Sequence, residues 1–175
     1  MHTVFPIAFW ATTAFVVVAA VIDVRTQRIP NWLSLPCLVA GLGFSGMTHG
    51  WSGLGLSLLG LLTAALVFGI FCYLGGMGMG DVKLFAAVGA WLGPAQTFAA
   101  LLYTGVAGGI IAICWSLAGG FLVQSVRGTA ALISGFARRG LQPHETIVLD
   151  NPMTRRIPYA PAIAIGAILS FLLKH

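Results

Sequence analysis

Two aspartates, Asp23 and Asp81, are the residues of this sequence best suited to do chemistry. The chain has only two other acidic residues, Glu145 and Asp150, and both lie in a polar stretch. Asp23 follows a long apolar segment, and Asp81 follows the glycine-rich run at residues 75–80. Because an ionisable side chain beside or within a membrane segment costs free energy, each aspartate is a candidate for function.

A pair of carboxylates can perform acid–base chemistry. Two carboxylates held close together cannot easily both ionise, so they share a proton. One can then activate a water molecule while the other protonates a carbonyl or a leaving amine, as in aspartic peptidases. Taken singly, Asp23 could be a surface carboxylate paired with Arg25 or Arg28. The glycines before Asp81 favour function there, because they let a ligand backbone approach closely.

No other set of residues in the sequence suggests an active site. The three cysteines, Cys37, Cys72 and Cys114, lie singly in apolar stretches without metal-ligand spacing, so we interpret them as packing residues. The four histidines are scattered, and no serine or cysteine lies in a nucleophile motif. We therefore expect neither a metal nor a cofactor.

The composition indicates that a lipid bilayer surrounds the elements that position these aspartates. Of the 175 residues, 58% are hydrophobic and 7% are charged, whereas about a quarter of the residues in soluble domains are charged. The net charge of +5 is spread among apolar segments and offers no continuous basic face for nucleic acid. We expect an all-α polytopic membrane protein, with residues 1–175 forming one domain.

Six apolar segments predict about six transmembrane helices. The first is interpreted as a retained helix rather than a signal peptide, because no basic region precedes it. The fourth is short for a bilayer of about 30 Å, unless the preceding glycines extend it. A short turn is expected at residues 49–53. The expected segments are residues 4–22, 32–48, 54–74, 82–92, 95–123 and 157–173.

The basic residues predict the orientation of these helices. All of them except Lys174 lie in the loops at 23–31, 75–83 and 124–156, which six crossings place on one side. The positive-inside rule makes that side cytoplasmic, so both termini are expected to be periplasmic. Both aspartates then lie at the same cytoplasmic depth and can meet. The loop at about 124–156 is expected to be either an interfacial amphipathic helix or a mobile basic loop.

Small residues four positions apart are expected to allow close packing between helices. They are Gly46 with Gly50, Gly89 with Gly93, and Gly105 with Gly109. Such pairs are common in membrane helices and carry no information about function.

The residues around both aspartates resemble the type IV prepilin peptidases, a family of membrane aspartic peptidases. The sequence GMGDVK at residues 78–83 is similar to the family's Gly-x-Gly-Asp-x-Lys motif. The sequence RIPN at residues 28–31, after Asp23, is similar to the family's first catalytic segment, and residues 157–166 are similar to its closing helix. The resemblance covers nearly the whole chain in the same order.

This resemblance implies that Asp23 and Asp81 are the catalytic pair. It further implies that glycines of the motif let an extended substrate approach Asp81, and that the segment after Asp23 turns the chain. The lysine of the motif either acts on Asp81 and the substrate or anchors the helix at the interface. The supporting residues are Gly78, Gly80, Lys83, Pro30 and Asn31.

The implied substrate is a prepilin with a hydrophobic N-terminal helix and a short basic leader, which is cut at the cytoplasmic face of a bacterial inner membrane. The implied setting is a pilus or a type II-like secretion system, with the pilus assembly machinery as a further partner. Longer family members carry two Cys-x-x-Cys pairs and also methylate the new N-terminus. Since those pairs are absent here, we expect a peptidase without methyltransferase activity, as in Flp or tight-adherence pilus systems.

Other interpretations of the aspartates stay open at this point. A small proton- or cation-coupled transporter could use them as ion sites, although no internal repeat relates the two halves of the chain. A non-catalytic subunit of a secretion machine would tolerate asparagine at either position. Presenilin-like proteases share Gly-x-Gly-Asp but pair it with Tyr-Asp, whereas Ile22 precedes Asp23.

Overall fold

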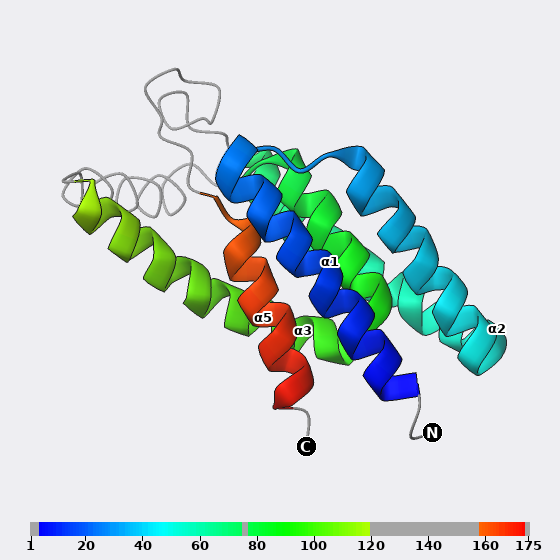
Figure 1. The fold of residues 1–175 in the computed structure, drawn as a ribbon. Coiled ribbons are helices and arrows are strands. Elements are labelled where there is room, and N and C mark those ends of the chain that lie inside the picture. The colour runs from blue at the N-terminus through cyan, green and yellow to red at the C-terminus, as the bar shows by residue number, and fades with distance from the viewer. Residues whose placement is uncertain (1–3, 75–76, 120–157, 174–175) are drawn as a thin grey trace.

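The computed structural model describes residues 4–74, 77–119 and 158–173, and these ranges are helical apart from the short segments that join or end the helices. The helices are α1 (Val4–Thr26), α2 (Asn31–Tyr73), α3 (Met79–Ala118) and α5 (Ala160–Leu172). Figure 1 shows them as one bundle, with the start of α1 and the end of α5 at the same end. The expectation of an all-α protein is confirmed for the described residues.

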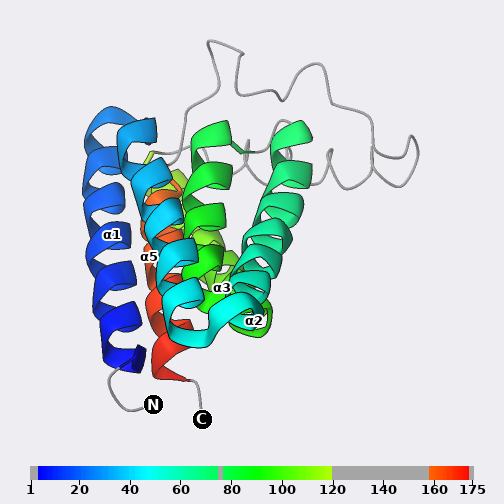
Figure 2. The ribbon, with the colours of Figure 1, turned by 90° about the vertical axis from the view of Figure 1, so that its right-hand side faces the viewer.

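Helices α2 and α3 each fold back on themselves at a single glycine. Gly50 in α2 has φ 62° and ψ −148°, and Gly93 in α3 has φ 72° and ψ 172°. Positive φ is sterically unfavourable for residues that carry a Cβ, so both positions favour glycine. Pro94 then begins the second arm of α3, where its missing N–H has no helical partner to lose. Figure 2 shows α2 running to the bend and returning.

The helical arms follow the order of the six expected segments, but their boundaries differ at the polar ends. Helix α1 continues past residue 22 to Thr26, so Asp23 lies within its last turns. The expected turn at 49–53 consists of a single non-helical residue, Gly50, because the helix resumes directly after it. Helix α3 begins at Met79, which shows that the glycine run contributes the first turn of the short fourth segment.

The last two segments differ from the expectation at their ends. The second arm of α3 ends at Ala118, with Gly119 as its C-cap, and residues 120–123 of the expected fifth segment lie outside the described residues. Helix α5 begins at Ala160, with Tyr159 as its N-cap, rather than at residue 157. The predicted loop at 124–156 lies outside the described residues.

Three helices in the described part of the chain are long and apolar enough to cross a membrane. They are the part of α1 from Ile7 to Thr26, the whole of α2 and the whole of α3. Helix α5 is shorter, with 13 residues. Each arm of α2 has roughly 20 residues, about 30 Å at 1.5 Å per residue, which is close to the thickness of the hydrocarbon core. The count of six spans and the periplasmic location of the termini stay predictions.

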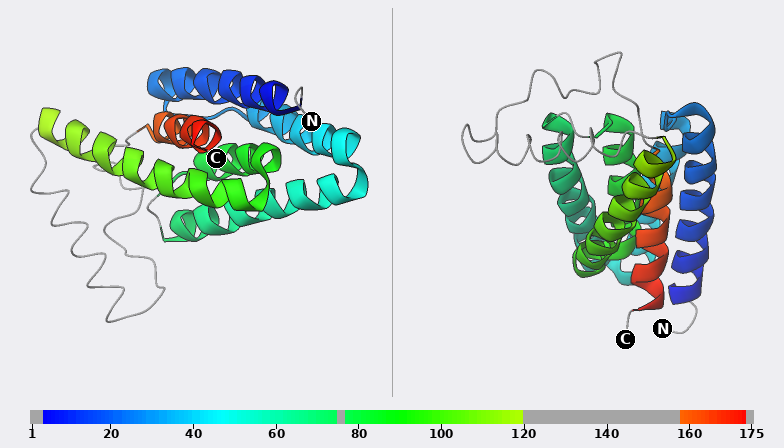
Figure 3. Two further views of the ribbon diagram at one scale, coloured as in Figure 1. Left: turned by 90° about the horizontal axis from the view of Figure 1, so that it is seen from below. Right: turned by 90° about the vertical axis from the view of Figure 1, so that its left-hand side faces the viewer.

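The first arm of α3 forms the centre of the bundle. Figure 3 shows it enclosed by the other helices, and Leu84, Phe85 and Val88 on this arm are fully buried. The ring of Phe68 on α2 stacks on Phe85 with their centroids 4.3 Å apart. Burial of these large apolar side chains holds the first turn of α3, and with it Asp81, in a fixed place.

Candidate active site

Asp23 is a buried carboxylate at the end of α1. Its side chain is only 5% exposed, and its Oδ2 accepts a hydrogen bond of 3.0 Å from the backbone N–H of Ala160. Ala160 is the first residue of α5. The N-terminus of a helix carries partial positive charge, so this position favours a carboxylate.

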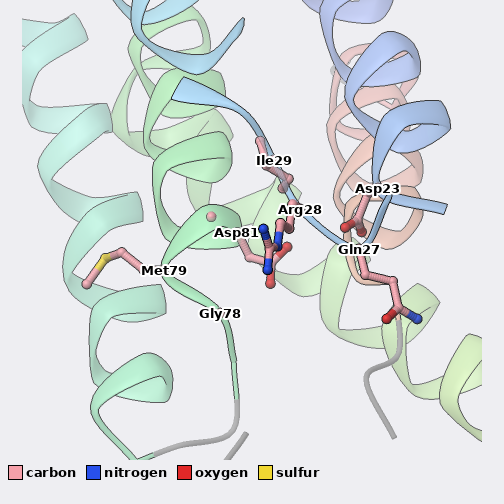
Figure 4. A pocket seen from close by; sticks show the side chains of 8 residues that line it. Asp23, Gln27, Arg28, Ile29, Gly78, Met79 and Asp81 are labelled. Atoms are coloured by element: carbon pink, nitrogen blue, oxygen red, sulfur yellow. The ribbon is translucent and has the colours of Figure 1, made fainter. Parts of the chain in front are cut away.

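The chain turns sharply after Asp23. The backbone N–H of Gln27 donates to the carbonyl oxygen of Asp23 at 2.7 Å, and Gln27 has φ 51°. A left-handed residue of this kind ends an α-helix. The turn directs the next two residues, Arg28 and Ile29, across the space between α1 and α3 (Figure 4).

Asp81 lies in the first turn of α3, three residues after the N-cap Gly78. The backbone N–H of Gly78 hydrogen-bonds the Asp81 carboxylate, and the N–H of Asp81 donates to the Gly78 carbonyl at 3.1 Å. An acidic side chain that reaches back to the N-cap N–H is half of a capping box. The start of a helix therefore orients each of the two aspartates.

Asp23 and Asp81 line the same pocket, which has a volume of about 280 Å³. Since a water molecule occupies about 30 Å³ in the liquid, the pocket has room for several. Figure 4 shows the two aspartates reaching this space from different helices. The other lining residues are Gln27, Arg28, Ile29, Gly78, Met79 and Gly80. Within the described ranges, no three His, Cys, Asp or Glu side chains gather as metal ligands.

Two acids around a space for water match the arrangement that general acid–base hydrolysis requires. The model of the type IV leader peptidase family matches residues 10–113, which is more than half of the chain and includes both aspartates. The chain belongs to the type IV leader peptidase family. This membership does not favour the transporter interpretation of the aspartates.

Three proteins similar to this leader peptidase family member share the name prepilin leader peptidase/N-methyltransferase. The Bacillus subtilis protein is 31% identical over 91% of this chain and 52% of its own length. The Escherichia coli protein is 38% identical over 55% of this chain and 45% of its own length. The Neisseria gonorrhoeae protein is 32% identical over 62% of this chain and 40% of its own length.

The chain spans about half the length of the relatives that it matches. No solved structure gives a significant match.

The structure brings some of the predicted supporting residues to the pocket of this family member and places others beside it. Gly78 and Gly80 line the pocket with the aspartates, whereas Pro30, Asn31 and Lys83 are not among its lining residues. The Lys83 Nζ donates a hydrogen bond of 3.1 Å to the Asn31 Oδ1. This bond links the first turn of α3 to the first turn of α2, a contact that the sequence analysis did not predict.

Sequence reasoning missed several residues around the pocket. Gln27 was not considered, Ile29 and Met79 were noted only as parts of motifs, and Arg28 was considered only as an ion-pair partner or part of a motif. Tyr159 was noted only within the similar tail. This residue directly precedes Ala160, whose backbone N–H binds Asp23, and its ring packs against Gly108 of α3. Proximity in sequence could have found the first four residues but not Tyr159.

Proposed function

We propose that this chain is an aspartic peptidase that removes the leader from prepilins, with Asp23 and Asp81 as its catalytic pair. One observation carries the proposal: two carboxylates from different helices line one pocket in a member of the type IV leader peptidase family. The backbone N–H groups of Ala160 and Gly78 support it, because they orient the carboxylates without using other side chains.

The reaction is hydrolysis of a peptide bond. One ionised aspartate takes a proton from a water molecule, whose oxygen attacks the scissile carbonyl carbon, while the other, protonated aspartate donates to the carbonyl oxygen. The tetrahedral intermediate then loses its amine, which takes up the proton held by the first carboxylate, while one hydroxyl group of the intermediate returns a proton to the second carboxylate. Both aspartates must be present in opposite protonation states, so removal of either carboxyl group stops the reaction.

The proposed substrate is a prepilin, in agreement with the names of the Bacillus subtilis and Escherichia coli relatives. Its hydrophobic helix lies in the bilayer beside this chain, and its basic leader reaches the pocket from the cytoplasm. The excess of basic residues in the loops on the aspartate side supports a cytoplasmic site in the inner membrane. We assign the chain to the Flp or tight-adherence type, working with pilus assembly machinery.

Methylation of the new N-terminus is not part of the proposed function. The three cysteines stand at positions 37, 72 and 114 and form no Cys-x-x-Cys pair. Purified protein incubated with a prepilin and labelled S-adenosylmethionine is expected to release the leader without transferring label. Transfer of the label to the shortened pilin would contradict this part of the proposal.

Co-expression with an Flp-type prepilin tests the peptidase proposal. We expect wild type to shorten the prepilin and Asp23→Asn and Asp81→Asn to leave it at full length. Glu145→Gln and Asp150→Asn are matched controls, because each removes one of the other two carboxylates of the chain. They are expected to cleave like wild type.

Each variant is also measured for its amount in the membrane fraction, so that loss of the protein is not mistaken for loss of activity. Cleavage that survives Asp23→Asn or Asp81→Asn would show that the two aspartates are not a catalytic pair. A wild type that leaves several prepilins uncut would contradict the proposed function as a whole.

A further inference from the structure

A short crossing segment, residues 27–30, leads from the end of α1 to the start of α2 and forms one wall of the pocket. Its first three residues, Gln27, Arg28 and Ile29, line the pocket together with the two aspartates. Figure 4 shows this segment passing between the helix that carries Asp23 and the helix that carries Asp81. A substrate that fills the pocket therefore contacts the crossing segment.

Local hydrogen bonds fix the turns at the two ends of the crossing segment. The Thr26 Oγ1 donates to the carbonyl oxygen of Arg28 at 3.0 Å. The carbonyl oxygen of Pro30 accepts from the backbone N–H groups of Leu33 at 3.1 Å and Ser34 at 3.4 Å. These bonds set the local shape of the segment, but they do not set its position relative to α3, which carries Asp81.

Two contacts join the segment to the start of α3. A Cβ added to Gly80 would lie 3.3 Å from the Ile29 Cβ and 3.6 Å from its backbone nitrogen, so the α3 backbone lies directly against Ile29. Three residues further along α3, the Lys83 Nζ donates a hydrogen bond of 3.1 Å to the Asn31 Oδ1, at the first residue of α2. Residues three apart share one face of a helix, so one face of α3 holds the segment at two successive points.

We infer that Lys83 is a positioning residue, which holds the crossing segment, and thus one wall of the pocket, against the helix that carries Asp81. Neither Lys83 nor Asn31 lines the pocket, so the lysine acts through the segment and not on the reacting atoms. This inference rests on the proposed peptidase function and goes beyond it, because it assigns the lysine to substrate binding through another residue.

The inference predicts which kinetic constant changes. The two aspartates are held by the backbone N–H groups of Ala160 and Gly78, independently of Lys83. Loss of the bond between Lys83 and Asn31 therefore leaves the catalytic pair in place and loosens only the wall that the substrate contacts. An effect of this kind appears in KM, with kcat unchanged.

Lys83→Met and Asn31→Ala are the first test, because they remove the donor and the acceptor of the same bond. Each is expected to raise KM for prepilin cleavage about three- to tenfold, the usual net contribution of one hydrogen bond. Since both side chains are exposed, the unfolding midpoint is expected to stay unchanged. Asn31→Asp keeps an acceptor oxygen, so its KM is expected to lie below that of Asn31→Ala. Arg25→Met is the matched control: it removes a cation from the last turn of α1 that does not line the pocket, and is expected to cleave like wild type.

The double variant Lys83→Met/Asn31→Ala distinguishes this role from others. Its KM is expected to be no higher than that of either single variant, because the two changes remove one shared bond. If Lys83 contacted the prepilin itself, Lys83→Met would raise KM and Asn31→Ala would not. If Lys83 acted on the protonation of Asp81, Lys83→Met alone would shift the pH profile of kcat. Either outcome, or additive effects in the double variant, would overturn the inference.

A spin label gives a measurement that does not depend on cleavage. A nitroxide is attached at Arg28→Cys, in a chain whose three native cysteines are replaced by alanine, and its spectrum is recorded in detergent micelles. The lines are expected to sharpen on adding Lys83→Met or Asn31→Ala and to stay unchanged on adding Arg25→Met. An unchanged line shape in the first two variants would show that Lys83 does not hold the segment. Wild type that cleaves no prepilin would instead overturn the proposed function.

Discussion

Glycines have opposite uses in two regions of this molecule. Midway along the bundle, Gly60 of α2 and Gly89 of α3 bring their backbones into direct contact, and a Cβ added to either would collide with the carbonyl oxygen of the other. At the pocket, a Cβ added to Gly78 or Gly80 would come no closer than 3.3 Å to any atom. Between Gly60 and Gly89 there is room for backbone atoms only, whereas Gly78 and Gly80 leave space beside the Asp81 carboxylate.

The difference teaches that the role of a glycine depends on what faces it, which spacing alone does not show. Of the three pairs expected to allow close packing, Gly89 and Gly93 do so, since both contact Gly60. The expectation was wrong for Gly105 and Gly109, since no atom of the described residues lies within 4 Å of a Cβ added to either. It was also wrong for Gly46 and Gly50: Gly46 faces only the side chain of Leu54 at an ordinary contact distance, and Gly50 forms the bend of α2.

The largest effect is expected where the two backbones touch. Gly60→Ala or Gly89→Ala places a methyl group against a carbonyl group that cannot move aside, and overpacking costs about 1–3 kcal/mol or more. Unfolding of the purified protein in sodium dodecyl sulfate is expected to occur at a lower detergent fraction. Wild-type stability of both variants would show that α2 and α3 are not in direct contact there.

Substitutions of Asp23 test whether the pocket residues also contribute to the stability of the protein. Asp23→Ala leaves the Ala160 N–H buried without an acceptor, which costs about 1–3 kcal/mol, whereas Asp23→Asn retains a side-chain oxygen that can accept this bond. We expect both variants to be inactive and only Asp23→Ala to be destabilised in the same unfolding assay. Equal stability of the two variants would contradict a structural role for the bond to Ala160.

A smaller effect, on activity alone, is expected at the pocket glycines. Gly80→Ala adds a methyl group 3.3 Å from the Ile29 Cβ, and Gly78→Ala adds one 3.4 Å from the Asp81 Oδ2. The Asp81 carboxylate can rotate and the Ile29 Cβ needs to move by only a few tenths of an ångström, so stability is expected to change by no more than about 0.5 kcal/mol. Prepilin cleavage is expected to fall several-fold because the methyl group narrows the pocket. Unchanged cleavage rates would show that the substrate does not approach these glycines.

The smallest effect is expected at glycines that face open space. Gly55→Ala and Gly69→Ala in the second arm of α2 add a methyl group with nothing within 4 Å. Alanine has the higher helix propensity, by up to about 1 kcal/mol in an exposed helix. Both variants are expected to be as active as wild type and no less stable. A loss of stability in either variant would contradict the open space beside Gly55 and Gly69.

The aspartate pair could be predicted from the sequence because carboxylates are rare in apolar segments. Asp23 and Asp81 are 58 positions apart, yet the pattern of basic residues predicts the same membrane face for both, and the structure places both on one pocket. The groups that hold them were not accessible. The Ala160 amide acts through backbone geometry, which leaves no pattern in the amino-acid sequence.

The fold could be predicted from the sequence to a similar extent. Hydropathy predicted the order of the helices and a break in the apolar pattern at each of the two bends, at residues 49–53 and at residues 93–94. It failed at the polar ends, where it stopped the first helix at residue 22 although the structure continues to Thr26. Hydropathy reports the surroundings of a side chain, whereas a helix ends where its backbone hydrogen bonds end.

The bond between Asp23 and Ala160 also has a consequence for the time at which the protein becomes active. It joins residues that are 137 positions apart, so a ribosome that adds about 5–20 residues per second makes the second partner on the order of 10 s after the first. Until α5 is inserted, the carboxylate of Asp23 has no amide to hold it. A chain that is still being synthesised, or that is cut before α5, therefore carries both aspartates without the amide that holds Asp23, and on the proposed function cleavage begins only once α5 is in place.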